Sequence, residues 1–283
     1  MKLTTALAAL MLAAAMAFAA CGDDDDGGGG GGGGEAATPA GPAKLTITAT
    51  GSGIEVPGSA APGVTEITLQ NDGKKDATGQ LLRIEGNRSE QEVVQTFNAV
   101  SDGDKIPEWI VGGGGLGTTK PGKSTVVTQE LEKGRYFVFN DADTPVTEKG
   151  YAVFKVSGES ADAELPAGST VTASEYKFES QKITAGEPIV FENVGDELHH
   201  LVGFPVLPGK TIAEAEKFLK TDKGEPAVDY EATVGTAVID SNQTLVTDLG
   251  LKKGKYLFVC FITDRAGGKS HFEKGMISEA TVE

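Results

Sequence analysis

Side chains able to bind a soft metal ion are concentrated near the end of this sequence. After residue 21, every histidine, cysteine and methionine lies between positions 199 and 276: His199, His200, Cys260, His271 and Met276. A thiolate and a thioether favour Cu(I), whereas imidazole accepts either oxidation state of copper. One cysteine, two histidines and one methionine therefore predict a site for a single mononuclear copper ion that exchanges one electron.

The segments that carry these residues resemble those of the cupredoxins, the plastocyanin-like, type 1 blue copper proteins. Gly254 to Cys260 is similar to the strand that leads into that family's cysteine ligand. His271 to Met276 has the family's histidine, three-residue gap and Gly-Met ending, followed by a final strand from Ile277 to Val282. Asn193 to His199 is similar to the segment that carries the first histidine. The resemblance implies that the copper ligands are His199, Cys260, His271 and Met276.

The histidine pair leaves one ligand position open. Spacing from Asn193 favours His199, whereas strand parity favours His200, which shares a strand face with Val202 and Phe204. We expect His199 to be the ligand. His200 and Asn193 would then support the site without touching the metal, His200 by steadying the cysteine loop.

The resemblance also implies a function, that of a one-electron carrier outside the cytoplasm. An imidazole edge would pass the electron to a redox partner protein in the cell envelope. A single copper ion is poorly suited to multi-electron chemistry, so we expect no enzymatic activity. Ten residues separate Cys260 from His271, more than in plastocyanin-like proteins, and they predict a flexible loop. The alternative is therefore a non-catalytic binding or copper-handling module with a degenerate cupredoxin fold.

The chain also contains an internal repeat. A shift of 122 positions aligns Ile67–Gly73 with Ile189–Gly195. The same shift aligns two S/T-x-x-E capping boxes, which begin at Ser89 and Thr211. Each box predicts the start of a short helix at the same place in its repeat.

Short β-branched and aromatic segments, separated by Gly, Pro, Asn and Asp, predict strands in both repeats. We therefore predict an all-β protein with two tandem cupredoxin-like Greek-key β-sandwiches, each with one short helix. The domains would span residues 44–158 and 169–283. Expected strands of particular interest below are Ile189–Glu192, Thr233–Ile239 and Tyr256–Ile262.

The first domain is expected to lack metal ligands. The repeat alignment places Ala77 or Thr78 opposite the histidine pair, Asn140 opposite Cys260 and Tyr151 opposite Met276. None of these side chains can form a copper–thiolate site. The glycine run Gly112–Gly117 predicts a mobile loop in this domain.

The N-terminus has the pattern of an exported lipoprotein. Lys2 precedes an apolar run that ends at Ala20, which predicts a signal peptide over residues 1–20. The residues before Cys21 resemble a lipobox, so we expect Cys21 to carry a lipid that attaches the protein to the outer face of the cell membrane or places it in the periplasm. Residues 21–43, rich in Asp and Gly, would form a tether.

Charge and cysteine content restrict the possible partners. The net charge is −16 and no basic face is apparent, so we expect no nucleic-acid partner. If Cys21 is lipidated, Cys260 remains as a lone thiol and no disulfide can form within the chain. An unpaired thiol in an oxidising compartment is consistent with a metal ligand.

Overall fold

The computed structural model describes residues 41–100, 103–142, 145–160 and 163–283, which belong to one compact unit. The signal peptide expected at residues 1–20, Cys21 and nearly all of the expected tether lie outside the described residues. Within the described part, no helix has the length and apolar character needed to cross a membrane.

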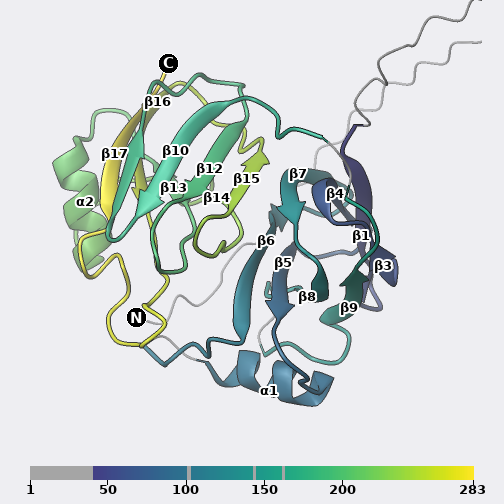
Figure 1. The fold of residues 1–283 in the computed structure, drawn as a ribbon. Coiled ribbons are helices and arrows are strands. Elements are labelled where there is room, and N and C mark those ends of the chain that lie inside the picture. The colour runs from purple at the N-terminus through teal and green to yellow at the C-terminus, as the bar shows by residue number, and fades with distance from the viewer. Residues whose placement is uncertain (1–40, 101–102, 143–144, 161–162) are drawn as a thin grey trace, which may run out of the picture. The chain divides into compact units, whose positions relative to one another are not determined.

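The first repeat is built mainly of strands, with one helix in its described residues (Figure 1). Its elements are β1 (Ala43–Ala49), β2 (Ile54–Glu55), β3 (Ser59–Ala60), β4 (Gly63–Asn71), β5 (Ala77–Ile84), α1 (Glu90–Ala99), β6 (Ile110–Thr119), β7 (Ser124–Leu131), β8 (Gly134–Phe139) and β9 (Tyr151–Val156).

The second repeat has a similar succession of elements. They are β10 (Ser169–Ser174), β11 (Lys177–Ser180), β12 (Ile189–Asn193), β13 (Val202–Pro205), α2 (Ile212–Thr221), β14 (Val234–Gly235), β15 (Thr244–Thr247), β16 (Gly254–Val259) and β17 (Ile277–Val282). The described chain is therefore mostly β-sheet with two short helices, as predicted.

The strands form three sheets, one of which contains strands of both repeats. Its order is β11-β10-β12-β15-β7-β4-β1-β2. The repeats join where β15 pairs antiparallel with β7, with Val246 opposite Thr128. The other sheets are β14-β13-β16-β17 in the second repeat and β3-β9-β8-β5-β6 in the first. Because one sheet is continuous, the assignment of two separate domains stays a prediction.

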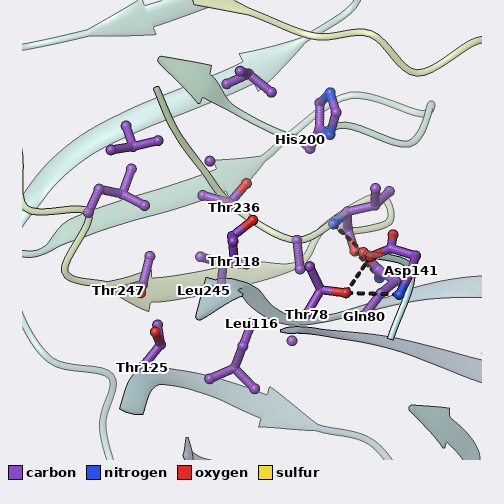
Figure 2. Close-up of a pocket in the computed structure, with 18 of the residues that line it drawn as sticks. Thr78, Gln80, Leu116, Thr118, Thr125, Asp141, His200, Thr236, Leu245 and Thr247 are labelled. Carbon is purple, nitrogen blue, oxygen red and sulfur yellow. Dashed lines mark hydrogen bonds between the residues drawn. The ribbon is translucent and has the colours of Figure 1, made fainter. Parts of the chain in front are cut away.

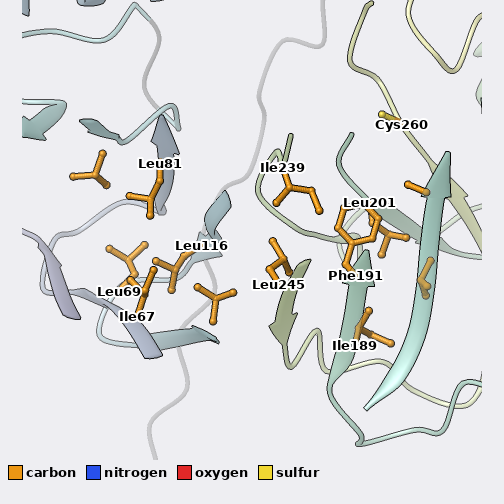
Figure 3. Packing of buried hydrophobic residues seen from close by; sticks show 14 of the residues in the cluster. Ile67, Leu69, Leu81, Leu116, Ile189, Phe191, Leu201, Ile239, Leu245 and Cys260 are labelled. Atoms are coloured by element: carbon orange, nitrogen blue, oxygen red, sulfur yellow. The ribbon is translucent and has the colours of Figure 1, made fainter. Parts of the chain in front are cut away.

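The core lies between these sheets and follows the period-2 alternation of the strands. In β12, Ile189 and Phe191 are fully buried (Figure 3). They belong to one cluster with Tyr256 and Phe258 of β16. Burying a large apolar side chain contributes about 1.5–3 kcal/mol. The same cluster includes Cys260 and Met276, so two of the expected ligands lie at the edge of the core.

Both capping boxes begin helices, as predicted. In α2 the box is complete: the Thr211 hydroxyl accepts from the Glu214 N–H, and the Glu214 carboxylate accepts from the Thr211 N–H. In α1 only half of the box forms. Ser89 accepts from the Glu92 N–H, but the Glu92 carboxylate accepts from Arg88 instead.

The glycine run is not a mobile loop, so that prediction was wrong. Residues 112–117 belong to strand β6, which lies against the second repeat. A Cβ at Gly117 would lie 2.5 Å from the carbonyl oxygen of Gly235, and a Cβ at Gly112 would lie 2.7 Å from Leu198. Glycine is needed here because two backbones approach closely. The strand expected at Thr233–Ile239 is correspondingly shortened to β14.

The same turn follows β4 in the first repeat and β12 in the second. The Asn71 side chain donates to Lys75 O (2.8 Å) and accepts from the Gly73 N–H (2.9 Å). The Asn193 side chain donates to Glu197 O (2.8 Å) and accepts from the Gly195 N–H (3.0 Å). These matching hydrogen bonds, 122 positions apart, support the proposed internal repeat.

We expect Gly117→Ala to reduce the free energy of unfolding by about 1–3 kcal/mol, the usual cost of overpacking. The added methyl group would meet the Gly235 carbonyl across the contact between repeats. The measurement is urea unfolding of the full chain. Gly51→Ala is the matched control, because a Cβ there meets nothing within 4 Å. Equal stabilities for the two variants would contradict this account of β6.

Candidate metal centre

Three of the expected ligands meet at one buried point. His199 lies between the Asn193 turn and β13, Cys260 directly follows β16, and His271 precedes β17. The Cys260 Sγ lies 3.5 Å from the His271 Nδ1, which lies 3.1 Å from the His199 Nδ1. All three ligand atoms lie within 4.8 Å of one another, and all three residues are 0% exposed.

These distances fit a single ion. Ligand bonds of about 2.0 Å to imidazole nitrogen and 2.3 Å to thiolate sulfur separate neighbouring ligand atoms by about 3.5 Å around one ion. The separations of 3.1 and 3.5 Å are close to this value. A thiolate with two imidazoles is the donor set that copper takes in mixed sulfur–nitrogen sites. The residues therefore fit one mononuclear copper ion.

The fourth expected ligand, Met276, is held beside the cluster. It is fully buried in the same apolar core as Cys260. Its backbone N–H donates to the carbonyl oxygen of His271 at 2.8 Å, which closes a tight turn between the two residues. This turn keeps Met276 close to His271.

The environment of Cys260 favours a protonated thiol until a cation is present. Burial raises the pKa of the Cys260 thiol to about 12, although backbone hydrogen bonds from His200 and Ile262 act in the opposite direction. A bound metal ion would replace the proton, since only the thiolate binds metals. The two backbone donors would then help to stabilise the negative sulfur.

His271 is oriented by an acidic neighbour. Its Nε2 lies 3.1 Å from Asp264 Oδ1, so a neutral ring carries its proton on Nε2 and leaves the Nδ1 lone pair free for a metal. Burial opposes ionisation of Asp264, but the hydrogen bond and charge of Lys274, with help from Tyr176 and His271, hold its pKa below the usual value. The lowered pKa keeps Asp264 available as an acceptor.

His199 is fixed through its backbone. Its N–H donates to Ile239 O at 3.0 Å, and its carbonyl accepts from the Ile239 N–H at 2.9 Å. Burial, followed by the nearby His271, lowers the pKa of His199 to about 4, so the ring is neutral at pH 7. Its Nε2 is buried without a hydrogen-bond partner among the described residues. A neutral imidazole is the form that binds metal.

His200 and Asn193 lie outside the cluster. The His200 Nε2 accepts from the Phe261 N–H at 3.0 Å, which links His200 to the residue that follows Cys260. Asn193 makes its hydrogen bonds within the turn that precedes His199. Asn71 makes the same bonds in the repeat without ligands, so the role of Asn193 in building the turn does not depend on a metal.

In the first repeat, residues aligned with the expected ligands form hydrogen bonds with each other. Asn140 Oδ1, opposite Cys260 in the repeat alignment, accepts from the Thr78 backbone N–H at 3.0 Å. Tyr151, opposite Met276, stacks on Phe137 instead. The first repeat thus brings Thr78 and Asn140 together, and none of its aligned residues is a soft ligand.

A pocket lined by residues of both repeats is separate from the metal centre. It encloses about 410 Å³ between the two repeats, and its lining includes His200 and several threonines but none of the four expected ligands (Figure 2). Thr78 and Asp141, which are hydrogen-bonded to each other, lie on one side of it. The metal centre is instead closed by packed side chains.

Two expectations about the surroundings of the site require correction. An imidazole edge was expected to pass the electron to a partner, but His199 and His271 are both 0% exposed, and Asp264 lies against the His271 ring. The loop was expected to be flexible, yet it makes the specific bonds described above. The roles of Asp264, Lys274 and Tyr176 were not foreseen, since only the folded loop brings them to His271.

No family model matches the sequence, and no curated protein has significant similarity to it. Several solved structures are similar to part or most of the chain. Auracyanin from Roseiflexus castenholzii is 17% identical, with a TM-score of 0.28, over 40% of this chain and 94% of auracyanin. Auracyanin A from Chloroflexus aurantiacus, described as a "blue" copper protein, is 13% identical, with a TM-score of 0.25, over 40% of this chain and 99% of its own.

A longer match involves an enzyme. The copper nitrite reductase from Nitrosomonas europaea is 15% identical, with a TM-score of 0.22, over 85% of this chain and 93% of its own. The similar structures thus include a "blue" copper protein as well as an enzyme, and their TM-scores are too low to decide the function of this chain. The all-β architecture and the buried His/Cys/His cluster are what the sequence resemblance to cupredoxins implied.

We expect the metal-free protein to lose stability as the pH falls from about 6.5 to about 4. The pKa of His199 is about 4 in the folded chain and takes its ordinary value of 6.5 when unfolded. Below 6.5 the unfolded chain binds more protons, so acid favours unfolding. Urea unfolding between pH 7.5 and 4 measures this. In His199→Gln the free energy of unfolding should fall less steeply with decreasing pH. Part of the decrease should remain, because the pKa of His200 is lowered as well. An unchanged slope in His199→Gln would contradict the assignment of this pH dependence to His199.

Proposed function

We propose that this protein is a one-electron carrier that holds a single copper ion in its second repeat. The observation that carries the proposal is the convergence of the Cys260 sulfur and the Nδ1 atoms of His199 and His271, three fully buried ligand atoms from segments far apart in the chain. Met276, buried in the same core, would be the weak fourth ligand. When bound, copper would alternate between Cu(I) and Cu(II).

The choice of His199 over His200 rests on hydrogen bonding. The His199 Nδ1 faces the cluster, whereas the His200 Nε2 is occupied by the Phe261 N–H. Rotating His200 into the site would break that bond and leave a backbone donor without a partner. His200 therefore suits a supporting role.

The protein is built to hold its ligands still rather than to admit a substrate. The ligand side chains are fully buried, and the cavity between the repeats does not reach them. In the part of the chain that the structure describes, His199, Cys260 and His271 form the one cluster of this kind. A single ion without an open path for substrate supports electron transfer rather than catalysis, which is why we propose a non-enzymatic role.

An exposed aromatic side chain directly follows the cysteine. Phe261 is bonded directly to Cys260, is 38% exposed and contacts the rings of His200 and Phe272. Because both ligand imidazoles are covered, this side of the site offers the shortest covalent route from the sulfur to the exterior. A partner redox protein that contacts Phe261 would therefore lie one residue from a copper ligand.

The proposed setting is outside the cytoplasm. The signal-like N-terminus and the lipobox-like residues before Cys21 support export and attachment to the membrane through a lipid on Cys21. The partner would be another protein of the cell envelope. The net charge of −16 argues against a nucleic-acid partner and favours one with a basic surface.

Copper loading tests the proposal directly. The full mature chain with added Cu(II) should develop an intense visible thiolate-to-copper band, and Cys260→Ser should abolish it because the sulfur is removed. Visible absorption and copper quantification provide the readouts. The full chain is required, since β15 pairs with β7 of the first repeat. Copper bound by the wild-type chain without such a band would favour the copper-handling alternative.

The two neighbouring histidines provide a matched pair of variants. We expect His199→Gln to lose the band and to bind copper at least about tenfold more weakly, because an inner ligand is replaced. His200→Gln should keep the band, with at most a small shift from the altered Phe261 contact. Competition with a Cu(I) chelator measures the affinities. The opposite pattern would make His200 the ligand.

A further inference from the structure

The long loop between the two ligands Cys260 and His271 raises a physical question. A loop with ten intervening residues has many conformations, yet the ligands at its ends must keep a fixed separation. Inside the loop, the His271 N–H donates to Ile262 O at 2.8 Å, and the Gly267 N–H donates to Asp264 O at 2.8 Å. These bonds shape each half of the loop, but they do not attach its tip to the protein.

The tip is attached to the first repeat. The Ile106 N–H donates to Arg265 O at 2.9 Å, and the Gly268 N–H donates to Gly103 O at 2.9 Å. The two backbones are so close that a Cβ at Gly267 would lie 2.7 Å from Gly103 O. Gly267 also has a φ of +83°, which favours glycine. Residues 103–106 of the first repeat therefore pair with the tip of a loop that carries a ligand at each end.

The Arg265 side chain extends this attachment. Its guanidinium donates to Ile110 O at 3.0 Å, at the start of β6, and forms an ion pair with Asp240. The Asp240 carboxylate also accepts from the Gly112 N–H at 3.0 Å. The two charged side chains are 20% and 13% exposed, so solvent screens their interaction only weakly.

The same arginine is connected to both sides of His199. The Arg265 backbone N–H donates to the Glu197 carboxylate at 2.7 Å, two residues before His199. Asp240 directly follows Ile239, whose backbone pairs with His199. Arg265 thus links three parts of the protein: the loop that contains it, the two segments next to His199, and the first repeat.

We propose that the first repeat acts as a clamp on the metal centre, with Arg265 as the positioning residue. This inference rests on the proposed copper function and assigns a role to the repeat that has no ligands. In place of a short loop, contacts with residues 103–112 would fix the loop tip and thereby the separation of Cys260 and His271. Fixed ligands change little between oxidation states, which favours fast electron transfer.

Hydrogen exchange of the metal-free full chain tests the clamp without copper. Arg265→Gln should speed exchange of the amides of residues 262–271 by about tenfold or more, the factor expected when a charged hydrogen bond is lost. Exchange in β1 and β4 should stay unchanged. Arg88→Gln is the matched control, because Arg88 pairs with Glu92 beside α1. Equal loop exchange in Arg265→Gln, Arg88→Gln and the wild type would overturn the proposal.

Copper-loaded samples provide the second readout. In Arg265→Gln we expect a shifted visible band and a changed copper hyperfine splitting, and in Arg265→Lys, which keeps the charge without the planar fork, an intermediate effect. If the wild type shows no band, the copper function fails while the exchange result still decides the clamp. Should Arg265→Gln not fold, Gly267→Ala separates the same backbones with Arg265 intact, and unchanged loop exchange in that variant would equally overturn the proposal.

Discussion

Exclusion of water around the Cys260 sulfur is the constraint on which this site depends. The thiol lies at the edge of a continuous apolar core and faces two neutral imidazoles, in surroundings that raise its pKa to about 12. A buried thiolate without a compensating cation is strongly disfavoured. The same surroundings strengthen its attraction to a metal ion, because charges interact more strongly where the effective dielectric constant is low. A metal cation and the ionised thiol would thus stabilise each other at this site.

The two repeats have a similar succession of elements, but only the second contains the cysteine, histidines and methionine. Asn71 and Asn193 build the same turn with the same hydrogen bonds. Beyond that turn the repeats differ, since Asn140 is held by Thr78 in the first repeat, whereas Cys260 faces His271 in the second. A repeat without ligands is free to contribute surface instead. Strand β6 does so, because its glycines let its backbone approach the second repeat.

Local signals in the sequence predicted local structure well. Ser89 and Thr211 cap the starts of helices because the residues that form such a cap lie within four positions of one another. The cluster of His199, Cys260 and His271 could be predicted from residue types, because soft and imidazole donors are rare in this chain. Strand β6 could not, since glycine disfavours strands unless a neighbouring backbone needs the space, and that backbone lies in the other repeat. The link between Asp264 and His271 depends on the folded loop, and no spacing rule reveals it.

The pairing of β15 with β7 could not be predicted from the sequence either, because it joins residues more than a hundred positions apart. The fold of the second repeat therefore depends on the full chain.

X-ray absorption at the copper edge of the copper-loaded full chain tests the central claim most directly. The account predicts one copper ion per chain, with one sulfur at about 2.3 Å and two imidazole nitrogens at about 2.0 Å. A first shell of nitrogen and oxygen alone, without sulfur, would contradict it.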